Sequence, residues 1–258
     1  ATDHESARWL AETGQALGVD LKLESFHLSR VVPQECYLEV GGRRIQGLPF
    51  FDGGFTSPEG ISGSIRPAGS GTQIGLGRVG RASGPLGAEP NVEFQKHRGS
   101  SDHGALVAVA SGESPGLMAS NAPDFRQPFG PPVLQVSSEE GEWLTSQAQS
   151  NSPVHLVVSA ERLDSESFNV TGRVTGANQD APPLMVMTPR SGWWQCASER
   201  GAGVACWLEV MRKATQYRPF RDVIFVATSA HELGLDNFLE RRPGLVQDAH
   251  VWLHFGAD

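Results

Sequence analysis

The strongest constraint on the fold is a regular alternation of apolar segments in the last third of the chain. Short runs rich in β-branched residues alternate there with longer segments of helical periodicity. In order, they predict a strand at 184–188, a helix at 202–215, a strand at 223–228, a helix at 232–241 and a strand at 250–255. Because parallel strands need a crossover connection, this series predicts an α/β domain with a doubly wound, mostly parallel sheet.

The first 46 residues are predicted to belong to the same α/β domain. Thr2 and Glu5 have the spacing of a capping box and precede apolar residues at helical spacing, which predicts an N-terminal helix ending at Gly18. Near-alternating apolar residues at 19–28 and again at 36–40 predict two strands. We expect both strands to join the sheet of the α/β domain.

The middle of the chain is rich in Gly and Pro and predicts an inserted, β-rich domain. Buried strands are expected at 104–110, 132–137 and 154–159, with a helix at 139–149. The predicted domains are therefore 1–46, 47–165 and 166–258. A GxGxxG match at 75–80 is interpreted as chance, because no helix pattern follows it.

Composition excludes several classes of function. The chain has 258 residues, with 21 basic against 29 acidic side chains and a net charge of −8. Such a chain has no general attraction for nucleic acid, and no apolar run reaches the roughly 20 residues of a membrane span. Three cysteines without a CxxC pair support neither a disulfide framework nor a thiolate zinc site. We expect a soluble protein and leave its compartment open.

Polar residues gather where the predicted parallel strands end. Ligands of open α/β sheets bind beyond the carboxyl ends of the strands, so residues in these loops are the candidates. The candidates are Thr188, Arg190 and Ser191 after the first strand, Glu199 and Arg200 before the next helix, His231 and Glu232 after the second strand, and His254 ending the third. Imidazole and carboxylate groups meeting at one edge are suited to metal binding or acid–base chemistry.

Structural interpretations of the same residues stay open. Ser229 and Glu232 also have capping-box spacing, Glu199 also suits a first helical turn, and His254 also suits a hydrogen-bonded core position. Asn169 begins an Asn-Val-Thr glycosylation sequon that is uninformative by itself. The remaining histidines are interpreted as surface or structural residues: His4, His27, His97, His103, His155 and His250.

Four segments together resemble a known family. PPVLQVSSEEGEWL at 131–144, FNVTGRVTG at 168–176, ERGAGVACWLEVMR at 199–212 and RDVIFVATSAHELGLDNF at 221–238 follow in the order of the co-catalytic zinc aminopeptidases that carry a protease-associated (PA) domain. Aminopeptidase Y, glutamate carboxypeptidase and the non-enzymatic transferrin receptor belong to this group. The resemblance implies the same α/β fold, with a PA-like domain as the β-rich insertion.

The resemblance also implies a degenerate metal site. The family's first HxD motif stands here as Thr188-Pro189-Arg190, its bridging Asp as Glu199, its Glu-Glu pair as His231-Glu232, and a later Asp as His254. By this correspondence Glu199, Glu232 and His254 are candidate ligands for one divalent ion, zinc above all, or for none. The same correspondence makes His231, Glu232 and Arg190 candidate catalytic residues, with Arg190, Thr188 and Arg200 binding the substrate.

Three functions are compatible with these residues. The first is a divergent hydrolase of an amide or related carbonyl bond, with His231 as general base and Arg190 gripping a substrate carboxylate. The second is a non-catalytic binding protein that keeps the fold, and the third is a metal-independent lyase or isomerase. Substrates are expected to be small molecules or peptides, with no nucleic-acid or membrane partner.

The predicted sheet stops just after its third motif-bearing strand. A domain of this architecture would continue for on the order of a hundred residues. We therefore expect the chain to be a fragment whose C-terminal companion polypeptide completes the sheet and the crevice. A homo-oligomer is also compatible with the sequence.

Overall fold

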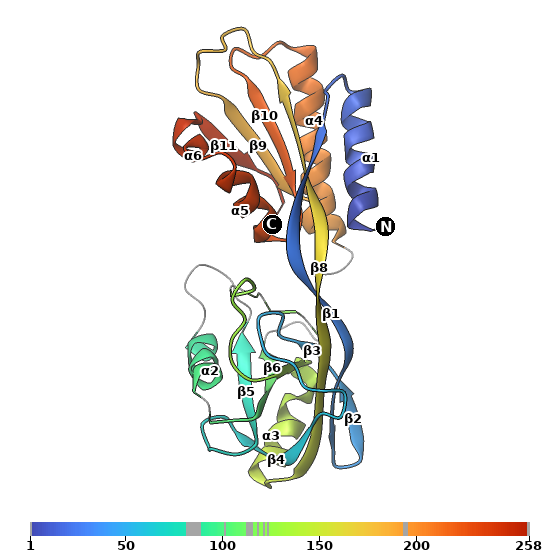
Figure 1. The fold of residues 1–258 in the computed structure, drawn as a ribbon, viewed down its shortest axis with the longest axis vertical. Coiled ribbons are helices and arrows are strands. Elements are labelled where there is room, and N and C mark those ends of the chain that lie inside the picture. The colour runs from blue at the N-terminus through green and yellow to red at the C-terminus, as the bar shows by residue number, and fades with distance from the viewer. Residues whose placement is uncertain are drawn as a thin grey trace. The chain divides into compact units, whose positions relative to one another are not determined.

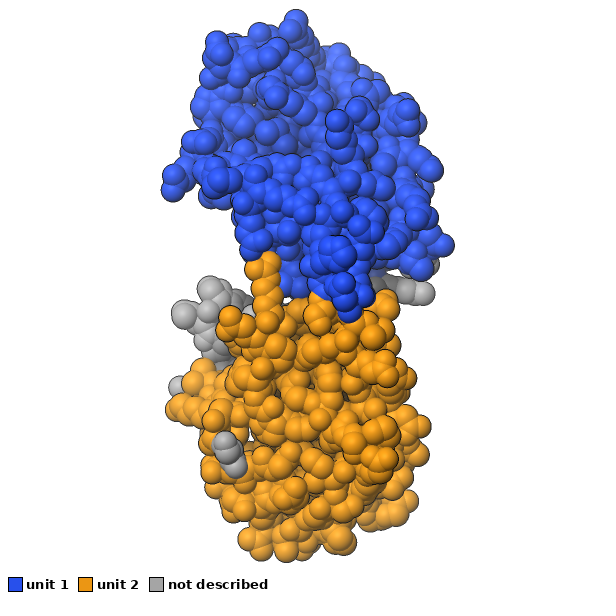
Figure 2. Space-filling view, viewed as in Figure 1, with its two compact units in different colours: residues 1–28, 164–258 blue, residues 29–163 orange. Residues whose placement is uncertain are grey.

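The computed structural model divides into two compact units (Figure 2). It describes residues 2–80, 89–100, 102–111, 116–117, 119–120, 122, 124–192 and 196–256. Unit 1 comprises Ala1–Leu28 with Asp164–Asp258, and unit 2 comprises Ser29–Leu163. Two long strands, β1 (Lys22–Val40) and β8 (Pro153–Val174), each contribute residues to both units.

Unit 1 contains the predicted α/β series. Its sheet has the order β11-β9-β10-β8, with β9 (Leu184–Pro189), β10 (Val223–Thr228) and β11 (Val251–His254) joining β8. Strands β11, β9 and β10 run parallel, whereas β10 and β8 are antiparallel. The predicted α/β class is therefore confirmed, and the carboxyl ends of β9 and β10 lie at one edge of the sheet.

Helices cover both faces of this sheet (Figure 1). On one face lie α1 (Asp3–Ala16) and α4 (Gly203–Gln216), which follows a π-helical turn, η2 (Ala197–Ala202). On the other lie α5 (Glu232–Glu240) and α6 (Leu245–Asp248). The predicted capping box begins α1, since the Thr2 hydroxyl accepts from the Glu5 amide and the Glu5 carboxylate accepts from the Thr2 amide. None of the helices among the described residues has the length and apolar character of a membrane span.

Two strands predicted in the first 46 residues are a single strand in the structure. The strands expected at 19–28 and 36–40 form the single strand β1, because backbone pairing continues where the apolar alternation lapses. The strand expected at 250–255 is confirmed as β11, which lies at the end of the sheet in the described part of the chain, with Val251 and Leu253 each 42% exposed. An apolar run does not distinguish a central strand from an edge strand. The predicted companion polypeptide, which would pair with this edge, stays a prediction.

Unit 2 is built around a β-rich core. Its strands are β2 (Arg43–Gln46), β3 (Leu48–Pro49), β4 (Ile61–Pro67), β5 (Ile74–Gly80), β6 (Ala105–Ser111) and β7 (Val133–Val136), together with parts of β1 and β8. Its helices are α2 (Glu89–Gly99), η1 (Ser138–Glu140) and α3 (Gly141–Gln149). The GxGxxG match lies within β5, which pairs with β4 and β6. It is therefore a strand and forms no phosphate-binding turn.

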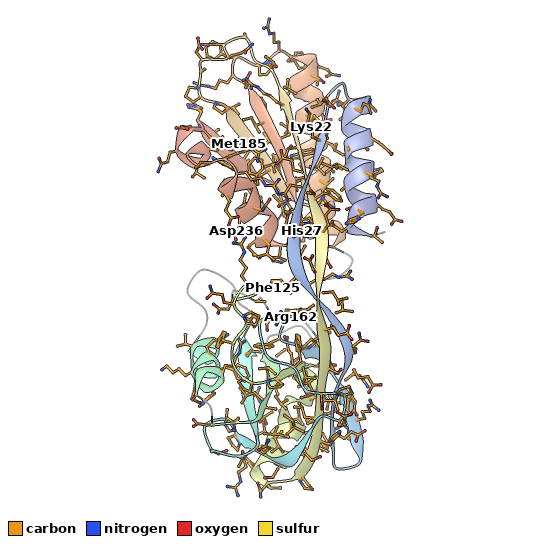
Figure 3. All side chains as sticks on the ribbon, viewed as in Figure 1. Lys22, His27, Phe125, Arg162, Met185 and Asp236 are labelled. Atoms are coloured by element: carbon orange, nitrogen blue, oxygen red, sulfur yellow. The ribbon has the colours of Figure 1, made fainter. Side chains whose placement is uncertain are left out.

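A buried ion pair in unit 2 holds the last turn of α2 to the loop after β3. The Arg98 guanidinium lies 2.9 Å from the Asp52 carboxylate, and the two side chains are 0% and 1% exposed. Arg98 also lies over the Phe129 ring at 4.1 Å from the ring centroid. Arg162 lies on β8, and its guanidinium is 6.0 Å from the centroid of the Phe125 ring. Figure 3 labels both residues. These buried contacts give Arg98 and Asp52 a structural role.

Candidate functional site

The loops after β9 and β10 meet at the carboxyl edge of the parallel strands. The Arg190 amide donates to the Thr228 carbonyl at 2.8 Å, which holds the two strand ends side by side. One residue further, the Ser191 hydroxyl accepts from the His231 amide at 3.1 Å. The sequence-predicted neighbours Ser191 and His231 are therefore brought together.

His231 lies on a strained turn between β10 and α5. Ala230 and His231 have φ values of 54° and 55°, and His231 has ψ −132°. Among the described residues, Asn151 is the one other non-glycine residue with positive φ. Such backbone conformations cost on the order of 1–3 kcal/mol each and are concentrated at functional sites. Two in succession mark this turn as the candidate site.

The turn presents a histidine–carboxylate pair. His231 Nδ1 lies 2.5 Å from Glu232 Oε2, with the side chains 26% and 74% exposed. The hydrogen bond from His231 lowers the pKa of the Glu232 carboxyl below its ordinary value, and the charge of Arg200 acts in the same direction. Because an ionised carboxylate only accepts hydrogen bonds, Nδ1 carries the proton and, in the neutral ring, Nε2 keeps its lone pair.

Arg200 lies at the same edge, on η2. Its guanidinium donates to the Ser191 carbonyl at 2.8 Å and to the Gly256 carbonyl at 3.3 Å. It also lies 3.0 Å from the Glu199 carboxylate, and the two side chains are 11% and 47% exposed. Arg200 therefore links the loop after β9 to the segment after β11, while Glu199 is held in an ion pair.

The side chains of two predicted substrate-binding residues lie in the interior of unit 1. The Thr188 side chain is fully buried, and a Cβ added at Gly203 would lie 2.9 Å from its hydroxyl oxygen, so it packs against the start of α4. The Arg190 side chain is 3% exposed and donates to Asp3, Ser6 and the Phe168 carbonyl. Arg190 thus anchors α1, and its buried guanidinium is engaged in these contacts.

The third predicted ligand, His254, lies on the edge strand β11, where it is exposed and pairs in register with Met187. Among the residues that the structure describes, no three His, Cys, Asp or Glu side chains converge closely enough to hold a metal ion. Glu199, Glu232 and His254 therefore do not form a ligand set here. Because His254 is exposed on this edge strand, it does not occupy the hydrogen-bonded core position that the sequence also allowed.

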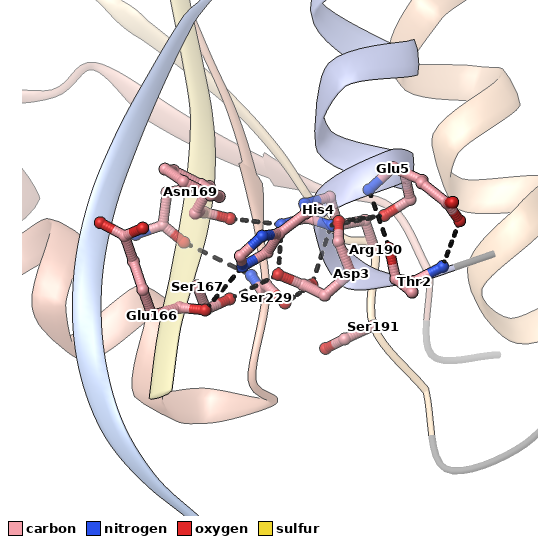
Figure 4. Close-up of polar contacts among 12 residues, drawn as sticks. Thr2, Asp3, His4, Glu5, Glu166, Ser167, Asn169, Arg190, Ser191 and Ser229 are labelled. Atoms are coloured by element: carbon pink, nitrogen blue, oxygen red, sulfur yellow. Dashed lines mark hydrogen bonds and ion pairs between the residues drawn. The ribbon is translucent and has the colours of Figure 1, made fainter. Parts of the chain in front are cut away.

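Sequence reasoning missed a polar network behind the strained turn, drawn in Figure 4. The Ser229 hydroxyl donates to the Asp3 carboxylate, and the Ser229 amide donates to Asn169 Oδ1 at 3.4 Å. The capping-box interpretation of Ser229 and Glu232 was wrong, since α5 has no side-chain cap. The one local pattern at Asn169, a glycosylation sequon, was uninformative, and no local pattern marked Asp3 as part of this network.

Comparison with family models and with curated proteins finds no match. Solved structures match at low identity. One is a zinc aminopeptidase from Bacillus subtilis, with 22% identity and a TM-score of 0.75, and the match covers 98% of this chain and 62% of that one. Another is an aminopeptidase from Aneurinibacillus, with 14% identity and a TM-score of 0.72, and the match covers 98% of this chain and 64% of that one. A peptidase precursor from Shewanella amazonensis also matches, with 15% identity and a TM-score of 0.74, and the match covers 99% of this chain and 65% of that one.

These matches define a class of fold. The chain has a zinc-aminopeptidase-like α/β fold, as the sequence resemblance implied. It spans 62 to 65% of the length of these solved structures.

Proposed function

We propose that this chain belongs to a hydrolase that cleaves an amide or related carbonyl bond in a small, carboxylate-bearing substrate. The observation that carries the proposal is the His231–Glu232 pair on a strained turn at the carboxyl edge of the sheet. Ligand sites of open α/β sheets lie at this edge. The zinc-aminopeptidase-like fold supports the same class of reaction.

In the proposed reaction, His231 acts as general base. Its Nε2 takes a proton from a water molecule as the water oxygen attacks the substrate carbonyl carbon. Glu232 accepts from Nδ1, fixes the orientation of the ring and stabilises the imidazolium that forms. The imidazolium then gives its proton to the leaving nitrogen as the carbon–nitrogen bond breaks. One water is consumed and no proton is left over.

The zinc ion that the resemblance implies does not fit the described residues as they are arranged. Glu232 is engaged by His231, Glu199 is engaged by Arg200, and His254 belongs to the edge strand. No three candidate ligands converge within the described part of the chain. We therefore propose a reaction in which no step uses a metal ion.

Arg200 is the better of the two predicted arginines for a substrate carboxylate. Its guanidinium holds Glu199, whose side chain is 47% exposed, at 3.0 Å. A substrate carboxylate that displaced Glu199 would meet the same planar donor group, which suits bidentate binding. Arg190 keeps its structural contacts with α1 in this proposal.

The test compares His231→Gln and Glu232→Gln with the wild type on aminoacyl anilides, N-acyl amino acids and lactones. His27→Gln is the matched control, since His27 is an exposed histidine of unit 1 paired with Asp164. We expect a loss of at least 100-fold in kcat for His231→Gln, the usual contribution of a general base, and an unchanged rate for the control. Full activity of His231→Gln would overturn the proposal.

Elemental analysis of the same preparations tests the metal argument. We expect no stoichiometric zinc, and the same rate before and after dialysis against a chelator. Stoichiometric zinc in the wild type that is absent from Glu232→Gln would show that the ligands rearrange to bind the ion. The mechanism would then have to include zinc.

A non-catalytic binding protein is the second candidate. The observation that favours it is the lack of a convergent ligand set among the described residues. Calorimetry with an N-acyl amino acid separates the two candidates. Binding without turnover, unchanged in His231→Gln, would support the second candidate against the first.

A further inference from the structure

We infer that Asn169 is a positioning residue that holds the turn carrying His231 and Glu232, an inference that rests on the proposed function of that pair. Asn169 lies on β8 and is fully buried. The next residue on β8 pairs in register with Ala227, near the end of β10. The Asn169 side chain is therefore fixed beside the point where the turn begins.

One carboxamide bridges both ends of the turn. Asn169 Nδ2 donates to the Gly234 carbonyl at 2.7 Å, and Asn169 Oδ1 accepts from the Ser229 amide at 3.4 Å. The strained residues Ala230 and His231 lie between these two contacts. Because both ends are held by the same rigid side chain, the turn cannot relax without breaking a buried hydrogen bond.

The close fit of Gly234 supports this arrangement. A Cβ at position 234 would lie 2.2 Å from the Ser229 carbonyl oxygen and 2.7 Å from Asn169 Oδ1. Only glycine therefore allows the start of α5 to approach both the base of the turn and the carboxamide. Gly234, two residues after Glu232, is thus fitted closely against Asn169.

The side chain of Ser229 is held from the opposite direction. Its hydroxyl donates to Asp3, whose carboxylate also accepts from Ser167 at 2.8 Å and lies 2.9 Å from the Arg190 guanidinium, as Figure 4 shows. The backbone of Ser229 is thus tied to β8 and its side chain to α1. The Arg190 guanidinium is thus linked to the Ser229 hydroxyl through the Asp3 carboxylate.

The burial of Asn169 also determines whether its glycosylation sequon can be modified. The Asn169 amide nitrogen is enclosed and donates to a backbone carbonyl, so it is not an acceptor for a glycan in the folded protein. An Asn–x–Thr sequence needs an exposed loop for that modification. We assign Asn169 to the turn instead.

The first experiment needs no variant. In wild-type protein with labelled asparagine, the Asn169 side-chain amide protons should exchange with deuterium at least 100-fold more slowly than those of a free carboxamide. Exchange at the free rate would overturn the inference, whether or not any substrate has been found.

The second experiment measures the side-chain nitrogen chemical shifts of His231 in Asn169→Ala and in Thr171→Val. Thr171 is the matched control, because it lies on the same strand and is 7% exposed, but its hydroxyl bonds Glu24. We expect Asn169→Ala to turn a single Nδ1-protonated tautomer into a mixture, and to lower kcat at least tenfold. Thr171→Val should keep the wild-type spectrum.

The outcomes separate this inference from the proposed function. An unchanged His231 spectrum in Asn169→Ala would refute the positioning role even if the enzyme is active. A changed spectrum in a protein without hydrolytic activity would support the positioning role and count against the hydrolase. If Asn169→Ala does not fold, the exchange measurement on the wild type still tests the inference.

Discussion

Replacing Ala230 with glycine should make unit 1 more stable, although it removes a methyl group. Ala230 has φ 54°, in the left-handed region that L residues avoid at a cost of about 1–2 kcal/mol. Glycine adopts this conformation without that cost but adds about 0.4–1 kcal/mol of chain entropy to the unfolded state. The net gain is about 1 kcal/mol, which corresponds to a rise in Tm of roughly 4 °C.

The matched control is Ala177→Gly, which carries the same change in unfolded-state entropy. Ala177 is exposed and is not among the residues with positive φ. This variant should lose about 0.4–1 kcal/mol, because it gains flexibility without relieving strain. Urea unfolding followed by circular dichroism gives the free energy of unfolding of each variant against the wild type. The difference between the two variants should be about 1.5 kcal/mol.

The result that would refute this reasoning is an Ala230→Gly variant that loses as much stability as Ala177→Gly. It would mean that the turn is not strained in solution. If the proposed function is right, the stabilised variant should also be less active, because a relaxed turn holds His231 less firmly. A gain in stability with a loss of activity is the usual outcome at functional sites.

Three further predictions follow from contacts on both units. Gly234→Ala should lose about 2 kcal/mol of stability or more, measured by urea unfolding, because the new methyl group meets backbone at 2.2 Å. Burial works to raise the pKa of Asp3, but Arg190 and two hydroxyls outweigh it and hold that pKa below its ordinary 3.8. Its contribution to stability is therefore present above about pH 4. That contribution is lost as pH falls through the lowered pKa, so acid titration of wild type should show a loss of stability that Asp3→Asn lacks. Arg98→Met should lose about 3 kcal/mol, since it leaves the buried Asp52 without a partner, and hydrogen exchange should place the loss in unit 2.

The sequence predicted best where both faces of an element are buried. The strands at 184–188 and 223–228 were predicted within one residue of β9 and β10, because central parallel strands have continuous apolar runs. The prediction failed for the extent of β1, and it did not reveal that β11 is exposed. A strand shared by two units need not keep one face buried, and an edge strand has the composition of a central one.

At the candidate site, topology was a better guide than residue identity. The rule that ligands bind at the carboxyl ends of parallel strands selected His231, Glu232 and Arg200, which lie at one edge in the structure. It did not distinguish them from Thr188 and Arg190, whose side chains turn into the interior. Successive residues at the end of a strand point in different directions. Their hydrogen-bond partners decide which side chains remain available to a ligand.

The partners that hold the site are remote in sequence, which explains why no motif revealed them. Asn169 lies 60 positions from the Ser229 amide that it binds, and Asp3 lies 226 positions from the Ser229 hydroxyl. A strained turn can be kept only by contacts from outside it, since its own residues favour relaxation. In the family correspondence Glu232 matches and His231 replaces a glutamate, and this replacement contributes to the implied degenerate site. The buried Asn169 carboxamide and the glycine fitted against it instead indicate a turn that is actively held in one conformation.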